Sequence, residues 1–175
     1  MPSINRRHFL KTSTAGLALT ATGRAAPSET LTLGVIGTGG RAQAHLYSVH
    51  QYGAAKIAAI CDIYDTNLRR SAKVIEDRQG TAPKLYTDFR KLLENKSLDG
   101  VITATPHHWH ALITVAALEA GKHIYVEKPA SHVFAEGRRI VDAAKRNKRI
   151  VQHGTQMRSS EVTLAADKVL KSGIL

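Results

Sequence analysis

The chain has 175 residues, which is enough for one ordinary domain and little more. A hydrophobic content of 43% suits a globular core, and no segment is long and apolar enough to act as a stable membrane anchor. The formal charge is +11, but its densest run, at 138–149, fits the solvated face of a helix better than a nucleic-acid site. Aromatic residues make up only 5%, so base-stacking platforms are not indicated and no nucleic-acid partner is expected.

The first residues show the pattern of an export signal. The pair Arg6-Arg7 precedes a mildly apolar, small-residue stretch over 12–22, and Gly23 and Ala25 suit a cut after Ala25. Paired arginines of this kind are typical of the twin-arginine route, which exports folded proteins. We therefore expect a twin-arginine signal peptide at 1–25, a linker at 26–30, and a periplasmic or otherwise exported protein. The alternative is a disordered basic tail.

From Leu31 onward, short apolar runs alternate with helical patterns. We expect strands at 31–36, 56–61, 85–86, 100–104, 123–126 and 149–153. We expect helices at 41–52, 65–79, 88–95, 108–120, 134–147 and 161–171, with Asp88 as the cap of the third. This alternation predicts an α/β fold, a Rossmann doubly wound parallel sheet with helices on both faces.

A glycine-rich turn joins the first expected strand to the first expected helix. It reads Gly37-Thr38-Gly39-Gly40-Arg41-Ala42 and fits the pattern G-x-G-x-x-A. Gly37 permits the tight turn, Gly39 lets the backbone approach a pyrophosphate, and the helix N-terminus offers free N–H groups to the phosphates. Asp62 ends the second strand, where an acid can accept a hydrogen bond from an adenosine ribose hydroxyl. We therefore predict a dinucleotide-binding domain over 31–155, the alternative being a glycine turn in a non-binding α/β domain.

Asp62 also bears on the choice of cofactor. A 2′-phosphate beside this carboxylate would be repelled, so NAD is favoured over NADP. Three nearby arginines keep NADP open, because an arginine can accommodate that phosphate. They are Arg41, Arg69 and Arg70.

The turn after the fourth expected strand, 105–111, is rich in histidine and lies on the ligand side of such a sheet. The residues that we expect to contact the dinucleotide there are Thr105, Pro106, His108, Trp109 and His110. Trp109 and a histidine would form an apolar and hydrogen-bonding wall; the alternative is that Trp109 packs under the loop. The three histidines His107, His108 and His110 could suggest a metal site. No metal is expected, because their spacing matches no tetrahedral ligand set and no cysteine or acid is close to them in sequence.

The tripeptide Glu127-Lys128-Pro129 closes the fifth expected strand. Pro129 ends the strand ladder and biases Lys128 towards an extended backbone, at the strand end where ligands bind in open α/β sheets. The Lys128 ammonium is therefore aimed at the ligand side of such a sheet. The alternative is a surface ion pair between Lys128 and a neighbouring acid such as Glu127.

Together these motifs resemble the Gfo/Idh/MocA oxidoreductases, over Leu31 to Leu175. The Glu-Lys-Pro tripeptide is the most specific element, and the leader is similar to that of the exported bacterial branch of the family. The other matching elements are the glycine-rich turn, Asp62, 105–111, Gly121-Lys122-His123 and Gly154-Thr155-Gln156-Met157-Arg158.

The resemblance implies an NAD(P)-dependent reaction on a sugar or polyol, with Glu127 at the cofactor site. It also implies that Lys128 lies between nicotinamide and substrate and is the catalytic residue, which agrees with the chemistry, because an ammonium near a developing alkoxide stabilises its charge. Family members carry a second α/β domain that binds substrate, often supplies the proton acceptor and supports oligomerisation. The chain ends about where that domain would begin. We therefore expect 156–175 to be a linker and a helix leading to an absent C-terminal domain, so that this chain alone is inactive and a homo-oligomer forms only with that domain.

Two other functions stay open at this stage. Some exported relatives of such enzymes hydrolyse glycosides by transient oxidation of the sugar, elimination and re-reduction on tightly held NAD. Alternatively, the 175 residues are a nucleotide-binding module without chemistry of its own.

Overall fold

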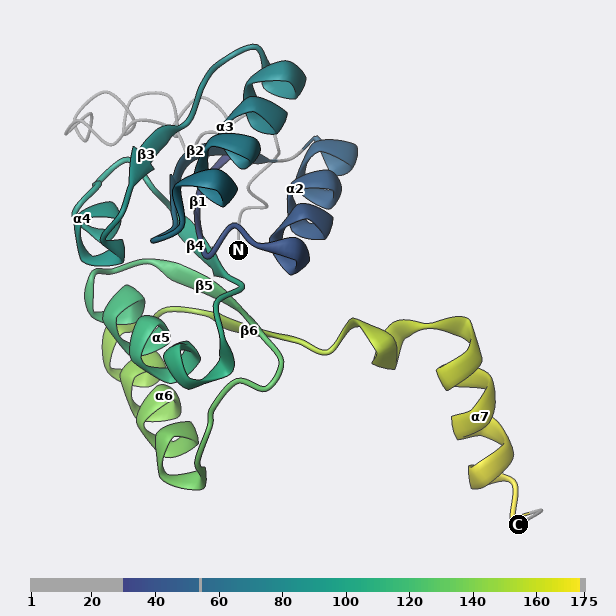
Figure 1. Ribbon diagram of the computed structural model, residues 1–175. Coiled ribbons are helices and arrows are strands. Elements are labelled where there is room, and N and C mark those ends of the chain that lie inside the picture. Colours follow the sequence, from purple (N-terminus) through teal and green to yellow (C-terminus); the bar gives the residue numbers. More distant parts are fainter. Residues whose placement is uncertain (1–29, 54, 174–175) are drawn as a thin grey trace, which may run out of the picture.

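Six parallel strands form one sheet in the order β3-β2-β1-β4-β5-β6, as seen in the computed structural model (Figure 1). The structure describes residues 30–53 and 55–173. The strands are β1 (Leu31–Ile36), β2 (Ala55–Cys61), β3 (Lys84–Tyr86), β4 (Gly100–Thr103), β5 (His123–Glu127) and β6 (Val151–Gly154). This confirms the predicted doubly wound Rossmann fold.

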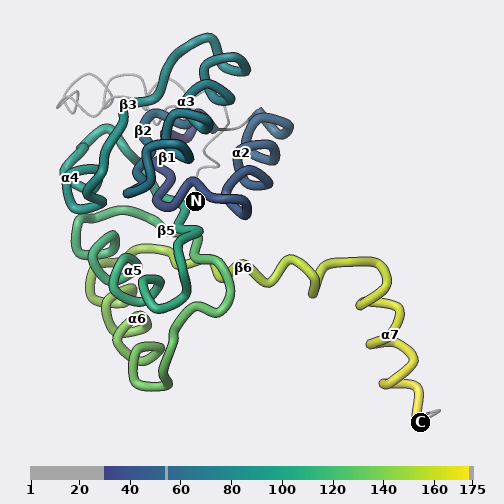
Figure 2. Tube along the Cα trace, viewed as in Figure 1, coloured from purple at the N-terminus to yellow at the C-terminus, as the bar shows by residue number. Residues whose placement is uncertain are grey.

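The helices alternate with the strands along the chain. They are α2 (Gly40–Tyr52), α3 (Asp65–Gln79), α4 (Phe89–Leu93), α5 (His110–Glu119), α6 (Phe134–Asn147) and α7 (Glu161–Lys171), with short 3₁₀ turns at His107–Trp109 and Gln156–Ser159. Figure 2 shows that α2 and α3 lie on one side of the sheet, and α5 and α6 on the other. None of the helices in the described part of the chain is long and apolar enough to cross a bilayer.

Side-chain alternation along the strands builds a separate core on each face. Val35 and Ile60 belong to a cluster that includes Leu46 of α2 and Ile75 of α3. Their neighbours in sequence point the other way because successive strand residues face opposite sides. The second cluster therefore contains Ile36 and Cys61, together with residues of α4, α5 and α6. Helices on both faces follow from this two-sided burial.

The direction of chain progression reverses between β1 and β4, which lie side by side in parallel register. From β1 the chain moves outward through β2 and β3, and from β4 it moves outward the other way through β5 and β6. The loops after β1 and β4 therefore leave the sheet in opposite directions and open a crevice between them. Such a switch point is where open α/β sheets bind ligands.

Several element boundaries differ from those expected. The fifth strand includes Glu127, because Glu127 pairs with Gly154. The last strand begins at Val151 rather than at 149, because Lys148 ends α6 with a left-handed backbone (φ 52°). The expected helix at 108–120 begins instead with a 3₁₀ turn, and α5 starts at His110. Asp88 is the cap of α4, as predicted, and its side chain accepts from the Arg90 N–H.

The last helix stands apart from the sheet. Figure 1 shows α7 projecting away from the other elements, and none of its residues is buried. Its N-terminus is capped by Ser160, whose hydroxyl accepts from the Thr163 N–H at 3.3 Å.

Candidate dinucleotide site

The glycine-rich turn presents an uncapped helix N-terminus at the crevice. Gly39 is the N-cap of α2, no side chain caps it, and the first turn carries no acid, so the leading N–H groups have no side-chain acceptor. Gly37 has φ +80°, and a Cβ there would lie 2.8 Å from the Thr105 backbone nitrogen. Only glycine allows the β1 and β4 loops to come this close. The turn therefore fits a phosphate-binding cradle.

Asp62 lies at the end of β2, beside this turn. Its Oδ2 accepts from the Thr38 N–H at 2.7 Å and from the Thr38 hydroxyl at 2.9 Å, while Oδ1 accepts from the Tyr64 N–H at 2.9 Å. These bonds fix the carboxylate between the glycine turn and the start of α3. The contact between Thr38 and Asp62 thus couples two of the predicted cofactor residues.

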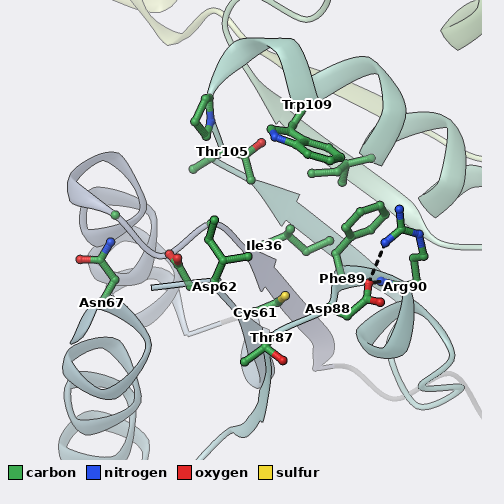
Figure 3. A pocket seen from close by; sticks show the side chains of 16 residues that line it. Ile36, Cys61, Asp62, Asn67, Thr87, Asp88, Phe89, Arg90, Thr105 and Trp109 are labelled. Atoms are coloured by element: carbon green, nitrogen blue, oxygen red, sulfur yellow. Dashed lines mark hydrogen bonds and ion pairs between the residues drawn. The ribbon is translucent and has the colours of Figure 1, made fainter. Parts of the chain in front are cut away.

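A cleft of about 630 Å³ opens beside these residues. Figure 3 shows Asp62 and Asn67 on one side of it, Thr105 and Trp109 on another, and Phe89 with Arg90 on a third. Gly37, Gly39 and Pro106 also line it. Trp109 is 39% exposed and meets Phe89 edge to face, with ring centroids 6.2 Å apart. The tryptophan therefore lines the cleft, and its ring also packs against Phe89 at the start of α4. Its contact with a dinucleotide stays a prediction.

Some of the cleft residues carry no recognisable signal in the sequence. Asn67 on α3 and Phe89 and Arg90 on α4 line the cleft because the loop after β3 folds back beside the ends of β1 and β2. Ile63 and Thr87 line it as well. Their positions immediately after β2 and β3 are the only hint, since residues just beyond parallel strands tend to face ligand.

The three arginines that kept NADP open all have protein partners. Arg41 Nε donates to Glu127 Oε1 at 2.7 Å, Arg69 Nε donates to Asp65 Oδ2 at 2.6 Å, and Arg70 donates to Asn67 Oδ1 at 3.1 Å. Arg70 also donates to the Thr38 carbonyl at 3.5 Å. A 2′-phosphate would have to compete for each of these groups while facing Asp62.

Glu127 lies beneath the site rather than at the cleft surface. It is 4% exposed, and its Oε1 accepts from Arg41 and lies 2.8 Å from His45 Nε2. Burial acts to raise the pKa of the Glu127 carboxyl, but hydrogen bonds from Arg41, the Lys128 N–H and His45 outweigh it and the pKa lies below its ordinary value. Glu127 therefore holds the start of α2 to the end of β5, and it does not line the cleft.

Lys128 follows β5 directly. Glu127 uses its carboxylate on Arg41 and His45, and the bond that joins it to Lys128 is from the Lys128 backbone N–H to Oε2, at 3.1 Å. Within residues 30–53 and 55–173, the Lys128 ammonium forms no ion pair. The expected alternative, a side-chain ion pair between Lys128 and Glu127, is therefore not what the structure contains.

The histidines of the β4 loop differ sharply from one another. His107 and His108 are exposed, whereas His110 is 2% exposed and both of its ring nitrogens face backbone carbonyls. The His107 ring lies against that of His132, with centroids 4.9 Å apart. In the part of the chain that the structure describes, no group of three or more metal-ligating side chains is arranged to hold a metal ion. Seven of the predicted site residues do not line the cleft itself. They are Thr38, Gly40, Arg41, His108, His110, Glu127 and Lys128.

The switch-point cleft, the uncapped glycine turn and Asp62 define an α/β dinucleotide-binding domain. Residues 31–155 match the family model described as "Oxidoreductase family, NAD-binding Rossmann fold", Gfo/Idh/MocA, and the chain belongs to this family. Its cofactor is NAD, as predicted.

Several known proteins are similar to this chain. An alpha-N-acetylgalactosaminidase of Shewanella oneidensis is 31% identical in an alignment that covers 85% of this chain and 39% of the relative. A glycosyl hydrolase family 109 protein of Shewanella putrefaciens is 32% identical, and the alignment again covers 85% of this chain and 39% of the relative. The WlbA dehydrogenase of Bordetella pertussis, solved with NADH and UDP-GlcNAcA, superposes with a TM-score of 0.73 at 23% identity, over 82% of this chain and 42% of that one. The myo-inositol 2-dehydrogenase of Lactobacillus plantarum gives the same TM-score at 21% identity, over 82% and 42%.

The two solved structures support the fold alone, because their sequences are distant. The chain spans about two fifths of the length of the relatives that it matches.

Proposed function

We propose that this chain is the cofactor-binding portion of an oxidoreductase that acts on a sugar or polyol. The observation that carries the proposal is the position of Lys128. It directly follows β5, its ammonium is free of ion pairs within the described residues, and the Glu127–Arg41 bond ties its strand to the phosphate-binding turn. Family membership supplies the reaction class.

NAD fits the site on the features of this chain. The free N–H groups of the turn at Gly39 and Gly40 would hold the pyrophosphate, and Asp62 would accept from an adenosine ribose hydroxyl. Thr105, Pro106 and Trp109 would border the bound dinucleotide. When bound, NAD supplies a reversible acceptor for the hydride of the substrate carbon.

Lys128 would act on the substrate hydroxyl. Its ammonium would donate a hydrogen bond to the oxygen and stabilise the negative charge that develops there as the carbon is oxidised. A base that takes the hydroxyl proton is still required, and we propose that it comes from a substrate-binding domain to which α7 leads, because the relatives are longer than this chain.

The named relatives favour a second function on the same site. Two proteins at 31–32% identity are named as an alpha-N-acetylgalactosaminidase and a glycosyl hydrolase family 109 protein. Such an enzyme would oxidise the sugar, cleave the glycosidic bond and return the hydride, with no net change in NAD. Accumulation of NADH with a free sugar supports the dehydrogenase, and cleavage of an aryl glycoside at constant bound NAD supports the hydrolase.

The decisive experiment replaces the lysine in the protein expressed from the full reading frame. Lys128→Ala should lower turnover by about a hundredfold or more while the affinity for NAD stays near wild type. Lys96→Ala, at another lysine of the chain, is the matched control and should change neither quantity. Unchanged turnover of Lys128→Ala would remove this residue from the mechanism.

We also propose that the protein is exported by the twin-arginine route. The residues concerned, 1–25, lie outside the described part of the structure, and the proposal rests on Arg6-Arg7 and the cut after Ala25. Replacement of both arginines by lysine should leave the protein in the cytoplasm in cell fractionation. Export of that variant would contradict the proposal.

A further inference from the structure

The buried ring of His110 bridges the two loops that border the candidate site. His110 begins α5 and is 2% exposed. Its Nδ1 lies 2.6 Å from the carbonyl oxygen of Pro129, and its Nε2 lies 2.8 Å from the carbonyl oxygen of Thr105. Thr105 belongs to the loop after β4, which lines the cleft, and Pro129 directly follows Lys128. One side chain therefore holds both loops.

The chemistry of these contacts determines which form of the ring can make them. A backbone carbonyl oxygen only accepts hydrogen bonds, and a neutral imidazole has a single N–H. Both distances are those of real hydrogen bonds. A neutral ring would therefore point a nitrogen lone pair at one of the two oxygens, in a place too buried for water to intervene. A ring with a proton on each nitrogen satisfies both carbonyls.

We propose that His110 is a positioning residue for Lys128, and that it works as a doubly protonated ring that donates to Thr105 and Pro129 at once. This role rests on the proposed function of Lys128. The two donors fix the Lys128-Pro129 segment against the cleft loop, so that the lysine is held at the end of β5 where the substrate oxygen would arrive. Neither nitrogen remains to contact NAD, so His110 acts through the backbone and not on the cofactor.

The protonation state can be measured without cofactor or substrate. Histidine-selective ¹⁵N labelling of the 175-residue chain, followed by a long-range ¹H–¹⁵N spectrum at pH 7.5, distinguishes a doubly protonated ring from either neutral tautomer. Assignment of the His110 signal uses its loss in His110→Asn. Two protonated nitrogens support the proposal, and one unprotonated nitrogen overturns it. This result does not depend on whether the proposed reaction is correct.

Two near-isosteric variants separate the two bonds. The amide nitrogen of asparagine can take the place of Nδ1, which faces Pro129, and that of glutamine can take the place of Nε2, which faces Thr105. His110→Asn should keep amide exchange at Ala130 and Ser131 near wild type, whereas His110→Gln and His110→Phe should accelerate it about tenfold. His132→Asn, at an exposed histidine, is the control and should not change it. Equal exchange in the Asn and Gln variants would overturn the positioning of this loop by His110.

Turnover then tests the link to Lys128, in the protein expressed from the full reading frame. His110→Gln should lower kcat about tenfold with little change in KM for NAD, and His110→Asn should restore most of kcat. A loss shared equally by kcat and NAD affinity would indicate damage to the whole cleft and would overturn the proposal. If Lys128→Ala retains full turnover while His110 is doubly protonated and controls loop exchange, the proposed function fails and the structural clamp stands.

Discussion

The Glu127 carboxylate accepts from the Arg41 guanidinium at 2.7 Å although the two residues are 86 positions apart in sequence. Arg41 lies in the first turn of α2, next to the glycine-rich turn, and Glu127 is the last residue of β5. His45, one turn further along α2, shares the same carboxylate oxygen at 2.8 Å. This partly buried contact fixes the glycine turn relative to the end of β5, and therefore relative to Lys128.

Loss of the Glu127 carboxylate should destabilise the domain. Glu127→Ala would leave Arg41 and His45 without their acceptor, and breaking a buried ion pair is costly. Because the Arg41 side chain is 44% exposed, we expect a smaller loss than for a fully buried pair, of about 2 kcal/mol in the free energy of unfolding. Urea unfolding measures it. Asp167→Ala, which breaks an exposed pair with Lys171, is the control and should cost less than about 0.5 kcal/mol. Equal losses in the two variants would show that burial of the Glu127 pair contributes nothing.

The same cluster predicts how stability depends on pH. Burial lowers the pKa of His45 below its ordinary value of 6.5, more than the adjacent Glu127 raises it. The unfolded chain therefore takes up a proton at His45 near that value while the folded ring resists it, so the contribution of His45 to stability falls as the pH drops below about 6.5. Glu127, with its lowered pKa, stabilises the fold above its ordinary value of 4.5, and this contribution is lost only as the pH falls through its lower folded value.

Urea unfolding at several values between about pH 7.5 and 5.5 tests the histidine effect separately. Relative to His45→Gln, the wild type should lose stability as the pH falls over this range, because only the wild type carries the His45 contribution. His50, whose pKa is also lowered by burial and by Arg78, accounts for part of the remaining slope. His108→Gln, at an exposed ring, should follow the wild type. A His45→Gln slope as steep as that of the wild type would contradict the assignment.

The close approach of the β1 and β4 loops predicts a strong effect at Gly37. In Gly37→Ala, the new methyl group would lie 2.8 Å from both the Thr105 nitrogen and its Cγ2, at a φ of +80°. We expect a loss of about 2 kcal/mol or more, together with weaker NAD binding, because the turn must move. Gly137→Ala, inside α6 with 3.7 Å to its nearest neighbour, should instead stabilise by about 0.5–1 kcal/mol. Thermal unfolding of both variants checks the contrast, and equal effects would disprove it.

Asp62 should decide between NAD and NADP. Asp62→Asn removes the charge that repels a 2′-phosphate and weakens acceptance from a ribose hydroxyl. We expect NAD affinity to fall about tenfold and the preference for NAD over NADP to narrow, measured by calorimetric titration of both cofactors. Asp77→Asn, at an exposed acid of α3 beside Lys73, should bind both as the wild type does. An unchanged preference in Asp62→Asn would mean that this carboxylate does not select the cofactor.

Local sequence patterns account for most of the fold but for less of the site. The bounds of α3 and α6 were predicted to the residue, because each helix has a clear apolar periodicity and a defined end. The βαβ alternation also predicts the doubly wound parallel sheet, but it fits more than one strand order and does not determine the order β3-β2-β1-β4-β5-β6. The third strand is only three residues long, and two of them are exposed, so its apolar signal is minimal.

The contacts between distant segments could not be predicted in the same way. Glu127 was considered as a partner of the adjacent Lys128, but it accepts from Arg41 and His45, because its side chain faces α2. Likewise, His110 was expected at the cofactor, and its nitrogens are instead bound to Thr105 and Pro129. A sequence shows which groups are available, whereas the packing of the loops determines which of them meet.

Trp109 gives a direct optical test of the cleft, because it is the only tryptophan of the chain and lines that cleft. With 39% of its surface exposed and Phe89 at its edge, its emission should change when a dinucleotide fills the neighbouring space. Titration with NADH should quench Trp109 emission and excite the nicotinamide by energy transfer. Trp109→Phe should lose both signals but still bind in calorimetry, with affinity reduced by less than about tenfold because an aromatic wall remains. Saturable calorimetric binding without any change in Trp109 emission would place the dinucleotide outside this cleft.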